Sequence, residues 1–132
     1  MNNIRFATLP LLALALAFTL APAQSASSRA NFRCGGIGSD EQQQFKAEAN
    51  RHHALLTFAR AGGDYLSDVD FSIADSRGKV VLEGRCGGPL MLLDLPGRGS
   101  YKVTATYDGK SQSKTVAVGT KPTRATFVWA GA

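Results

Sequence analysis

The chain has 132 residues and a formal net charge of +5, and its cationic side chains are scattered rather than gathered in runs. This length allows one domain, and dispersed positive charge is typical of a solvated surface, which argues against a nucleic-acid partner. The two cysteines fit neither a Cys-x-x-Cys motif nor the ligand spacing of a zinc site, and no histidine lies near either of them in the sequence.

The segment 1–23 has the three parts of a secretory signal peptide. Arg5 and the terminal amine make a positive start, and a nearly unbroken apolar run follows over 9–20. This run has the length of a signal core and is too short to span a bilayer comfortably. Small residues precede two candidate cleavage points, after Ala23 and after Ala26, and we place cleavage after Ala23. The alternative is an uncleaved anchor, which the small residues after the run disfavour, so we expect a periplasmic or secreted protein without a membrane span.

The segment 24–50 is predicted to form a loose lead-in and one short helix. Its first half is rich in small and polar residues. Ser39 is the predicted N-cap of the helix, with Gln42 three residues later as its capping-box partner. Good helix formers follow, and Phe45 and Ala49 lie four positions apart, which places both on one face.

The pair Cys34 and Cys86 is predicted to form one disulfide, because an even number of cysteines in an exported chain is typical of a structural bridge. Each cysteine stands in the same tetrapeptide, Arg-Cys-Gly-Gly, and glycine after cysteine lets the backbone turn tightly beside the bridge. A redox or metal role is the alternative, and the cysteine spacing disfavours it.

The glycine-rich run 35–38 before the helix suggests an anion site at a helix N-terminus. It follows no clear strand and lacks the lysine of a P-loop, so we interpret it as a flexible strap.

From residue 51 onward the hydrophobic pattern changes to the alternation of β-strands. Seven short strands are predicted, over 54–59, 69–74, 79–83, 90–93, 101–107, around 116–118 and over 125–129. Turns separate them, the clearest at 75–78 and at Asp108-Gly109, where both residues favour positive φ. The run 90–93 is apolar on both faces and should be covered on both sides. We therefore expect an all-β fold: a seven-stranded antiparallel β-sandwich of the transthyretin or immunoglobulin kind over 51–132, with a short N-terminal helix.

Four stretches of this chain resemble the carboxypeptidase regulatory-like domains of exported bacterial proteins. They are Val69-Asp-Phe-Ser-Ile-Ala-Asp-Ser-Arg-Gly-Lys-Val80, Leu93-Asp-Leu-Pro-Gly97, Tyr101-Lys-Val103 and Tyr107-Asp-Gly-Lys110. The resemblance spans about 55–128 and implies a transthyretin-like sandwich. Such domains are usually accessories without catalytic activity, so the resemblance implies a fold more than a function. The corner 96–101 is longer here than in the family pattern.

Among the aromatic residues, Tyr65 and Trp129 are the candidates for stacking on a ligand. Tyr101 and Tyr107 alternate with polar residues on the face expected to point inward, so core packing is favoured for both.

His52 and His53 are adjacent, and neighbouring residues on a strand point to opposite faces, so we do not expect both to bind one metal. Asp64, Asp68 and Asp70 cluster around a loop, but their spacing is not that of a calcium-binding EF-hand. We interpret both groups as solvated side chains and predict no metal and no cofactor.

No nucleophile elbow or other catalytic motif is present in the sequence. We therefore expect no enzyme, but an exported accessory that binds another protein or a component of the cell surface. A module that binds a small molecule or a carbohydrate is the alternative. A hydrolase or metalloenzyme is a third and weaker hypothesis.

Overall fold

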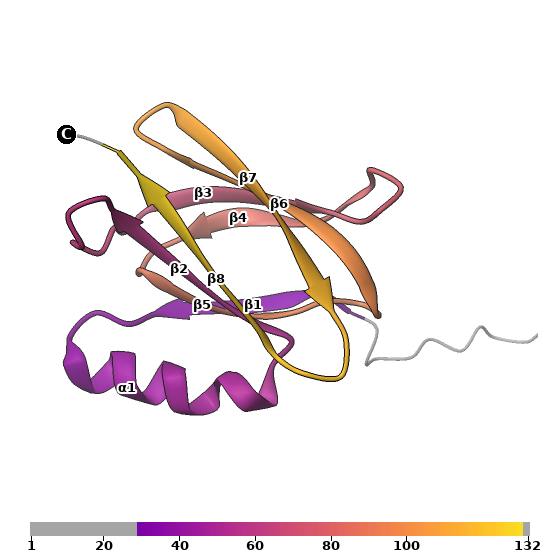
Figure 1. Cartoon of the computed structure of the whole chain (residues 1–132), viewed down its shortest axis with the longest axis horizontal. Coiled ribbons are helices and arrows are strands. Elements are labelled where there is room, and N and C mark those ends of the chain that lie inside the picture. The colour runs from indigo at the N-terminus through magenta and orange to yellow at the C-terminus, as the bar shows by residue number, and fades with distance from the viewer. Residues whose placement is uncertain (1–28, 131–132) are drawn as a thin grey trace, which may run out of the picture.

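The structure is a computed structural model that describes residues 29–130 (Figure 1). The predicted signal peptide and its cleavage points lie outside the described residues. In chain order the elements are β1 (Asn31–Gly35), α1 (Ser39–Glu48), the 3-10 helix η2 (Ala49–Arg51), β2 (Ala54–Arg60), β3 (Val69–Ala74), β4 (Val80–Cys86), β5 (Leu90–Asp94), β6 (Gly99–Tyr107), β7 (Lys110–Val118) and β8 (Thr123–Trp129). No helix in this part of the chain is long and apolar enough to cross a membrane.

The strands form two sheets of four, packed face to face as a sandwich (Figure 1). The strand order is β1-β5-β2-β8 in the first sheet and β4-β3-β6-β7 in the second. All pairs are antiparallel except β2 and β8, which run parallel. Strand β1 lies beside β4 on one side of the sandwich, and β8 lies beside β7 on the other. The all-β sandwich is confirmed, with eight strands instead of seven and one parallel pair.

The additional strand is β1, which the sequence analysis assigned to a loose lead-in. It pairs with β5 over its whole length, with Phe32 opposite Leu93 and Cys34 opposite Met91. Only two of its five residues point into the sandwich, so its local hydrophobic pattern is too short to be distinguished from a loop. Pairing with the buried strand β5 makes it a strand, and the sandwich therefore includes residues before 51.

The core lies between the two sheets. Val69, Phe71 and Ile73 of β3 are buried as their alternation predicts, and Tyr101 is buried with them. Tyr107 is half-buried and packs against the same core. The largest fully buried side chains include aromatic and branched residues from both sheets: Phe58, Phe127, Leu56, Ile73, Val103 and Val116.

Strand β5 is covered on both faces, as its unbroken apolar run predicts. Met91 and Leu93 point into the sandwich. Leu90 and Leu92 point outward and are buried under α1, where they pack with Phe45, Ala49 and Leu55. The predicted apolar face of the helix is thus confirmed, and α1 forms a third layer over part of the first sheet (Figure 1).

The start of α1 differs from the predicted capping box. The N-cap residue is Gly38 rather than Ser39, and no side chain caps the helix. Instead the carboxylate of Glu41 reaches back and accepts the backbone N–H groups of Gly36, at 2.7 Å, and Ile37, at 2.9 Å. The bond to Gly36 is possible because that residue turns at φ +92°, a conformation that favours glycine. The glutamate therefore fixes the loop before the helix.

The two turns that the sequence identified most clearly are confirmed. At the tip of the β6–β7 hairpin, Asp108 and Gly109 have φ values of 52° and 74°. At the β3–β4 turn, Asp75 Oδ1 accepts the backbone N–H groups of Arg77 and Lys79, both at 2.9 Å. Both bonds lower the pKa of Asp75 below its usual value, and the bond from Lys79 has the larger effect.

The lowered pKa of Asp75 predicts how stability depends on pH. Its contribution to folding is present above the ordinary carboxyl value of 3.8 and is lost as the pH falls through the folded value. We expect Asp75→Asn to be less stable than the natural protein at neutral pH, and the difference to shrink in strong acid. Urea unfolding of both proteins across this pH range measures the difference in stability.

The control is Glu83→Gln, which removes an exposed carboxylate from the same hairpin. Glu83 accepts no hydrogen bond from another side chain within residues 29–130. If Asp75→Asn lowers the free energy of unfolding by the same amount at every pH, the charge on Asp75 does not stabilise the turn.

Candidate functional site

The two aromatic residues predicted as ligand contacts have different environments. Trp129 is 5% exposed, its ring lies against Phe58 and Phe127, and its indole N–H donates to the Lys110 carbonyl at 2.9 Å. It therefore presents no open ring face to solvent. Tyr65 is 42% exposed, so the prediction of a stacking contact rests on Tyr65 alone.

His52 and His53 lie just before β2, where the chain bends, and both approach Asp94 at the end of β5. The Nδ1 atom of His52 lies 2.8 Å from Asp94 Oδ2, and Nδ1 of His53 accepts the N–H of Leu95 at 2.9 Å. The expectation that they point to opposite faces of a strand is wrong, because neither residue belongs to the strand. Both line one pocket together with a loop after β7.

The three aspartates do not form one site. Asp70 pairs with Arg85 at 2.9 Å, whereas Asp68 adopts a positive φ of 60° in the loop before β3. The carbonyl group of Asp64 accepts the N–H of Arg60 in the turn after β2. Within residues 29–130 no group of three histidine, cysteine, aspartate or glutamate side chains could hold a metal ion.

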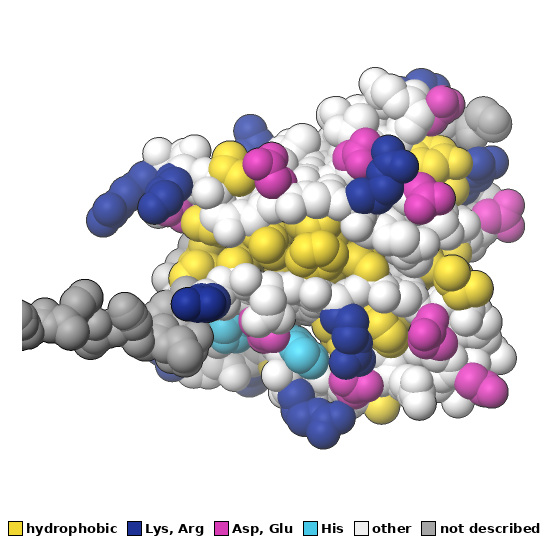
Figure 2. All heavy atoms as spheres, turned by 180° about the vertical axis from the view of Figure 1, so that it is seen from behind, with side chains coloured by type: hydrophobic (Ala, Val, Ile, Leu, Met, Phe, Trp, Pro, Cys, Tyr) yellow, Lys and Arg dark blue, Asp and Glu magenta, His cyan; other side chains and the backbone are white. Residues whose placement is uncertain are grey.

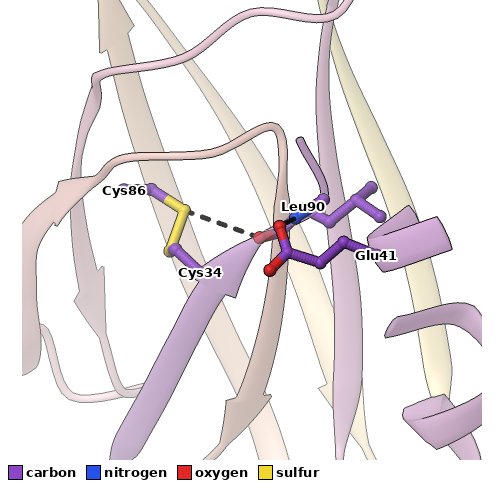
Figure 3. The surroundings of a disulfide bond; sticks show 5 residues. Cys34, Glu41, Cys86 and Leu90 are labelled. Carbon is purple, nitrogen blue, oxygen red and sulfur yellow. Dashed lines mark hydrogen bonds between the residues drawn. A yellow bond between two sulfur atoms is a disulfide. The ribbon is translucent and has the colours of Figure 1, made fainter. Parts of the chain in front are cut away.

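The two Arg-Cys-Gly-Gly elements meet at one end of the sandwich. The Cys34–Cys86 disulfide, predicted from the sequence, joins β1 to β4 with the Cα atoms 5.5 Å apart (Figure 3). The backbone of Gly88 lies directly against that of Gly35, so close that a Cβ atom on Gly88 would overlap the Gly35 carbonyl. Packing beside the bridge thus explains Gly35 and Gly88, whereas a Cβ atom on Gly87 would meet no atom within 4 Å. The predicted bridge implies that the two elements meet, whereas the close approach of Gly88 to Gly35 was not predicted.

The two sides of the sandwich are closed in different ways. On the β7–β8 side, side chains bond across the gap to the opposite backbone: Gln112 donates to the Val128 carbonyl at 2.8 Å, and Trp129 donates to Lys110. On the β1–β4 side no hydrogen bond within residues 29–130 joins the two strands. The disulfide is their link. We call this side the β1–β4 seam, defined by the residues of those two strands.

The β1–β4 seam exposes apolar surface. Phe32 of β1 and Val81 and Leu82 of β4 are half-buried and pack against the core. The ring of Phe32 packs edge-on against the ring of Phe71, with their centroids 4.9 Å apart. Both rings lie beside Gly84, which has no side chain that could cover them. Figure 2 shows hydrophobic side chains gathered in a band that runs between the two layers on the side opposite the view of Figure 1. Within residues 29–130, β1 and β4 each have one edge without a strand partner, as β7 and β8 also have.

Paired charges flank the β1–β4 seam. Arg33 donates to Glu48 at 2.7 Å, and Arg85 donates to Asp70 at 2.9 Å. These guanidinium groups hold the pKa of Glu48 and of Asp70 below the usual range. Because both pairs are exposed and internally neutral, the seam offers mainly apolar contacts and backbone groups.

Comparison with known proteins assigns no family to this chain. No protein-family model matches it, and no curated protein matches it. The resemblance to carboxypeptidase regulatory-like domains therefore stays a prediction from the motifs, and the function has to be argued from the geometry.

Proposed function

We propose that this protein is a non-enzymatic, exported binding module of the bacterial envelope that takes up an extended segment of a partner protein at the β1–β4 seam. The observation that carries the proposal is the difference between the two sides of the sandwich. Side-chain hydrogen bonds cross the β7–β8 side, whereas no hydrogen bond within residues 29–130 joins the edges of β1 and β4, which border the apolar band.

The strand edges suggest how a partner binds. An edge strand offers unpaired N–H and C=O groups, and an extended peptide that adds to it gains main-chain hydrogen bonds. Strand β1 has five residues, which corresponds to about 17 Å of extended chain. Alternate side chains of an added strand would point toward the sandwich, where Phe32 and Leu82 offer apolar contact. The partner segment is therefore expected to be short, extended and apolar at every second residue.

Export is supported by two independent features. The N-terminal segment has the pattern of a signal peptide, and the disulfide is of the kind that persists in an oxidising compartment. Membership of the carboxypeptidase regulatory-like family is part of the same proposal. The transthyretin-like sandwich that it implies is compatible with the fold, although β1 and the parallel β2–β8 pair are additional features.

The test is site-specific photocrosslinking in cells that produce the full chain. A photoreactive side chain is placed at Asn31, an exposed position on β1, or at Ser113, an exposed position on β7 that serves as the matched control. We expect a discrete crosslinked protein from Asn31 and none from Ser113. The purified partner segment should then shift amide resonances of β1 and β4 in the NMR spectrum of the mature protein.

Two results would contradict the proposal. One is the absence of a crosslink from Asn31, or the same products from both positions. The other is turnover of an envelope substrate by the purified protein, which would show an enzyme instead of a binding module.

A further inference from the structure

A polar pocket of about 280 Å³ lies at the end of the sandwich where β2 begins. Its walls come from three segments that are distant in the sequence: Arg51 of η2 with His52 and His53, Asp94 at the end of β5, and the loop 119–122 between β7 and β8. The N–H of Thr123 donates to the His53 carbonyl at 3.0 Å and ties that loop in place. The volume is below the range of about 300–1,000 Å³ that holds drug-sized ligands, so the pocket fits a small one.

The hydrogen bonds set different tautomers for the two histidines. Asp94 can only accept at Oδ2, so Nδ1 of His52 carries a hydrogen, and in the neutral form of the ring Nε2 is an acceptor. Nδ1 of His53 accepts the N–H of Leu95, so Nε2 of its ring carries the hydrogen and is a donor. These tautomers are assigned from the bonding partners. Neither Nε2 atom has a protein partner within residues 29–130.

The charges in the pocket leave an excess of positive charge. Both oxygens of Asp94 are engaged, one by His52 and the other by the backbone N–H of His53 at 3.2 Å. Arg51 and Lys121 also line the pocket, and neither forms an ion pair with a described residue. Glu48, whose pKa the nearby charge of Arg51 helps to lower, is itself paired with Arg33. The pocket lining therefore contains two cations, one ring donor and one ring acceptor.

We propose that this pocket binds a phosphate group, either inorganic phosphate or the headgroup of a small phosphate monoester. Near neutral pH the second ionisation of a phosphate monoester, with a pKa of about 6, leaves a fraction of the molecules with a P–OH. Such a group presents anionic oxygens to Arg51 and Lys121 and a hydroxyl to His52 Nε2, whereas an ionised carboxylate has no hydrogen to donate. This site is separate from the β1–β4 seam and does not depend on the proposed function.

The test uses the mature, disulfide-bonded protein in amine buffer at constant ionic strength. Inorganic phosphate, glycerol phosphate and acetate are titrated separately while the imidazole and backbone NMR signals are followed. We expect both phosphates to shift the signals of His52, His53 and the loop 119–122, and acetate to leave them unchanged. Tighter binding of glycerol phosphate than of inorganic phosphate would identify the monoester as the better ligand, and the reverse order would identify the free ion.

The variant Arg51→Gln with Lys121→Gln removes both unpaired cations, and we expect it to weaken phosphate binding about tenfold or more for each charge lost. The matched control is Lys110→Gln with Lys114→Gln. It changes the net charge equally on β7, outside the pocket, and should bind phosphate like the natural protein. Equal weakening in the two variants would show a nonspecific charge effect and overturn the proposal, as would equal shifts by acetate or no shifts at all.

Discussion

Replacing Cys34 and Cys86 together by alanine is expected to lower the free energy of unfolding by about 4 kcal/mol. The bridge closes a loop of 52 residues, so its loss releases a large amount of conformational freedom in the unfolded chain. It is also the link between β1 and β4, where no hydrogen bond within the described residues replaces it. Alanine is preferred to serine because Cys86 is fully buried, and a serine hydroxyl there would add a separate desolvation cost. Urea unfolding measures the change.

The control for the disulfide is reduction. Reductant should destabilise the natural protein by about the same amount as the double substitution and should leave the substituted protein unchanged. If the double alanine variant has the same unfolding midpoint as the oxidised protein, the bridge does not stabilise the fold.

Gly88→Ala is expected to lower the free energy of unfolding by about 3 kcal/mol. Its Cβ atom would overlap the carbonyl carbon and oxygen of Gly35, which are backbone atoms on a strand and cannot rotate away as a side chain can. The collision would push β1 from its place beside the disulfide. Thermal and urea unfolding measure the loss.

Gly87→Ala is the matched control, because a Cβ atom at Gly87 meets no atom within 4 Å. Since the two glycines are neighbours in one loop, the pair separates the collision from the general effect of a stiffer unfolded chain. We expect Gly87→Ala to change stability by no more than about 0.5 kcal/mol. Equal effects of the two substitutions would contradict the collision.

Much of the fold could be predicted because its local signals agree with its tertiary contacts. The alternation of Val69, Phe71 and Ile73 matches a strand with one buried face, and all three are buried. The Asp108-Gly109 turn needs two positive φ angles, and this pair of residues tolerates them. The disulfide could also be predicted, because a chain with two cysteines has one possible intramolecular pairing.

What the sequence could not predict depends on contacts between distant segments. Strand β1 has too few inward-facing residues for a periodic signal, and its pairing with β5 is not visible in its own residues. Trp129 looks like an open aromatic at the end of the chain, yet the two sheets enclose it. The polar pocket brings together His52, Asp94 and Lys121, and no local pattern relates residues so far apart.

The strand order also has a consequence for how the chain folds. In the second sheet, β3 with β4 and β6 with β7 are hairpins between consecutive strands, so both pairs form from nearby residues. In the first sheet no two neighbouring strands are consecutive in sequence, and β2 can pair with β8 only after the chain has been made through Trp129. Closing such long loops is slow, so the first sheet should assemble last, after the C-terminal strand is available. Until β8 is available the first sheet stays incomplete, and such late folding is compatible with the export that we propose.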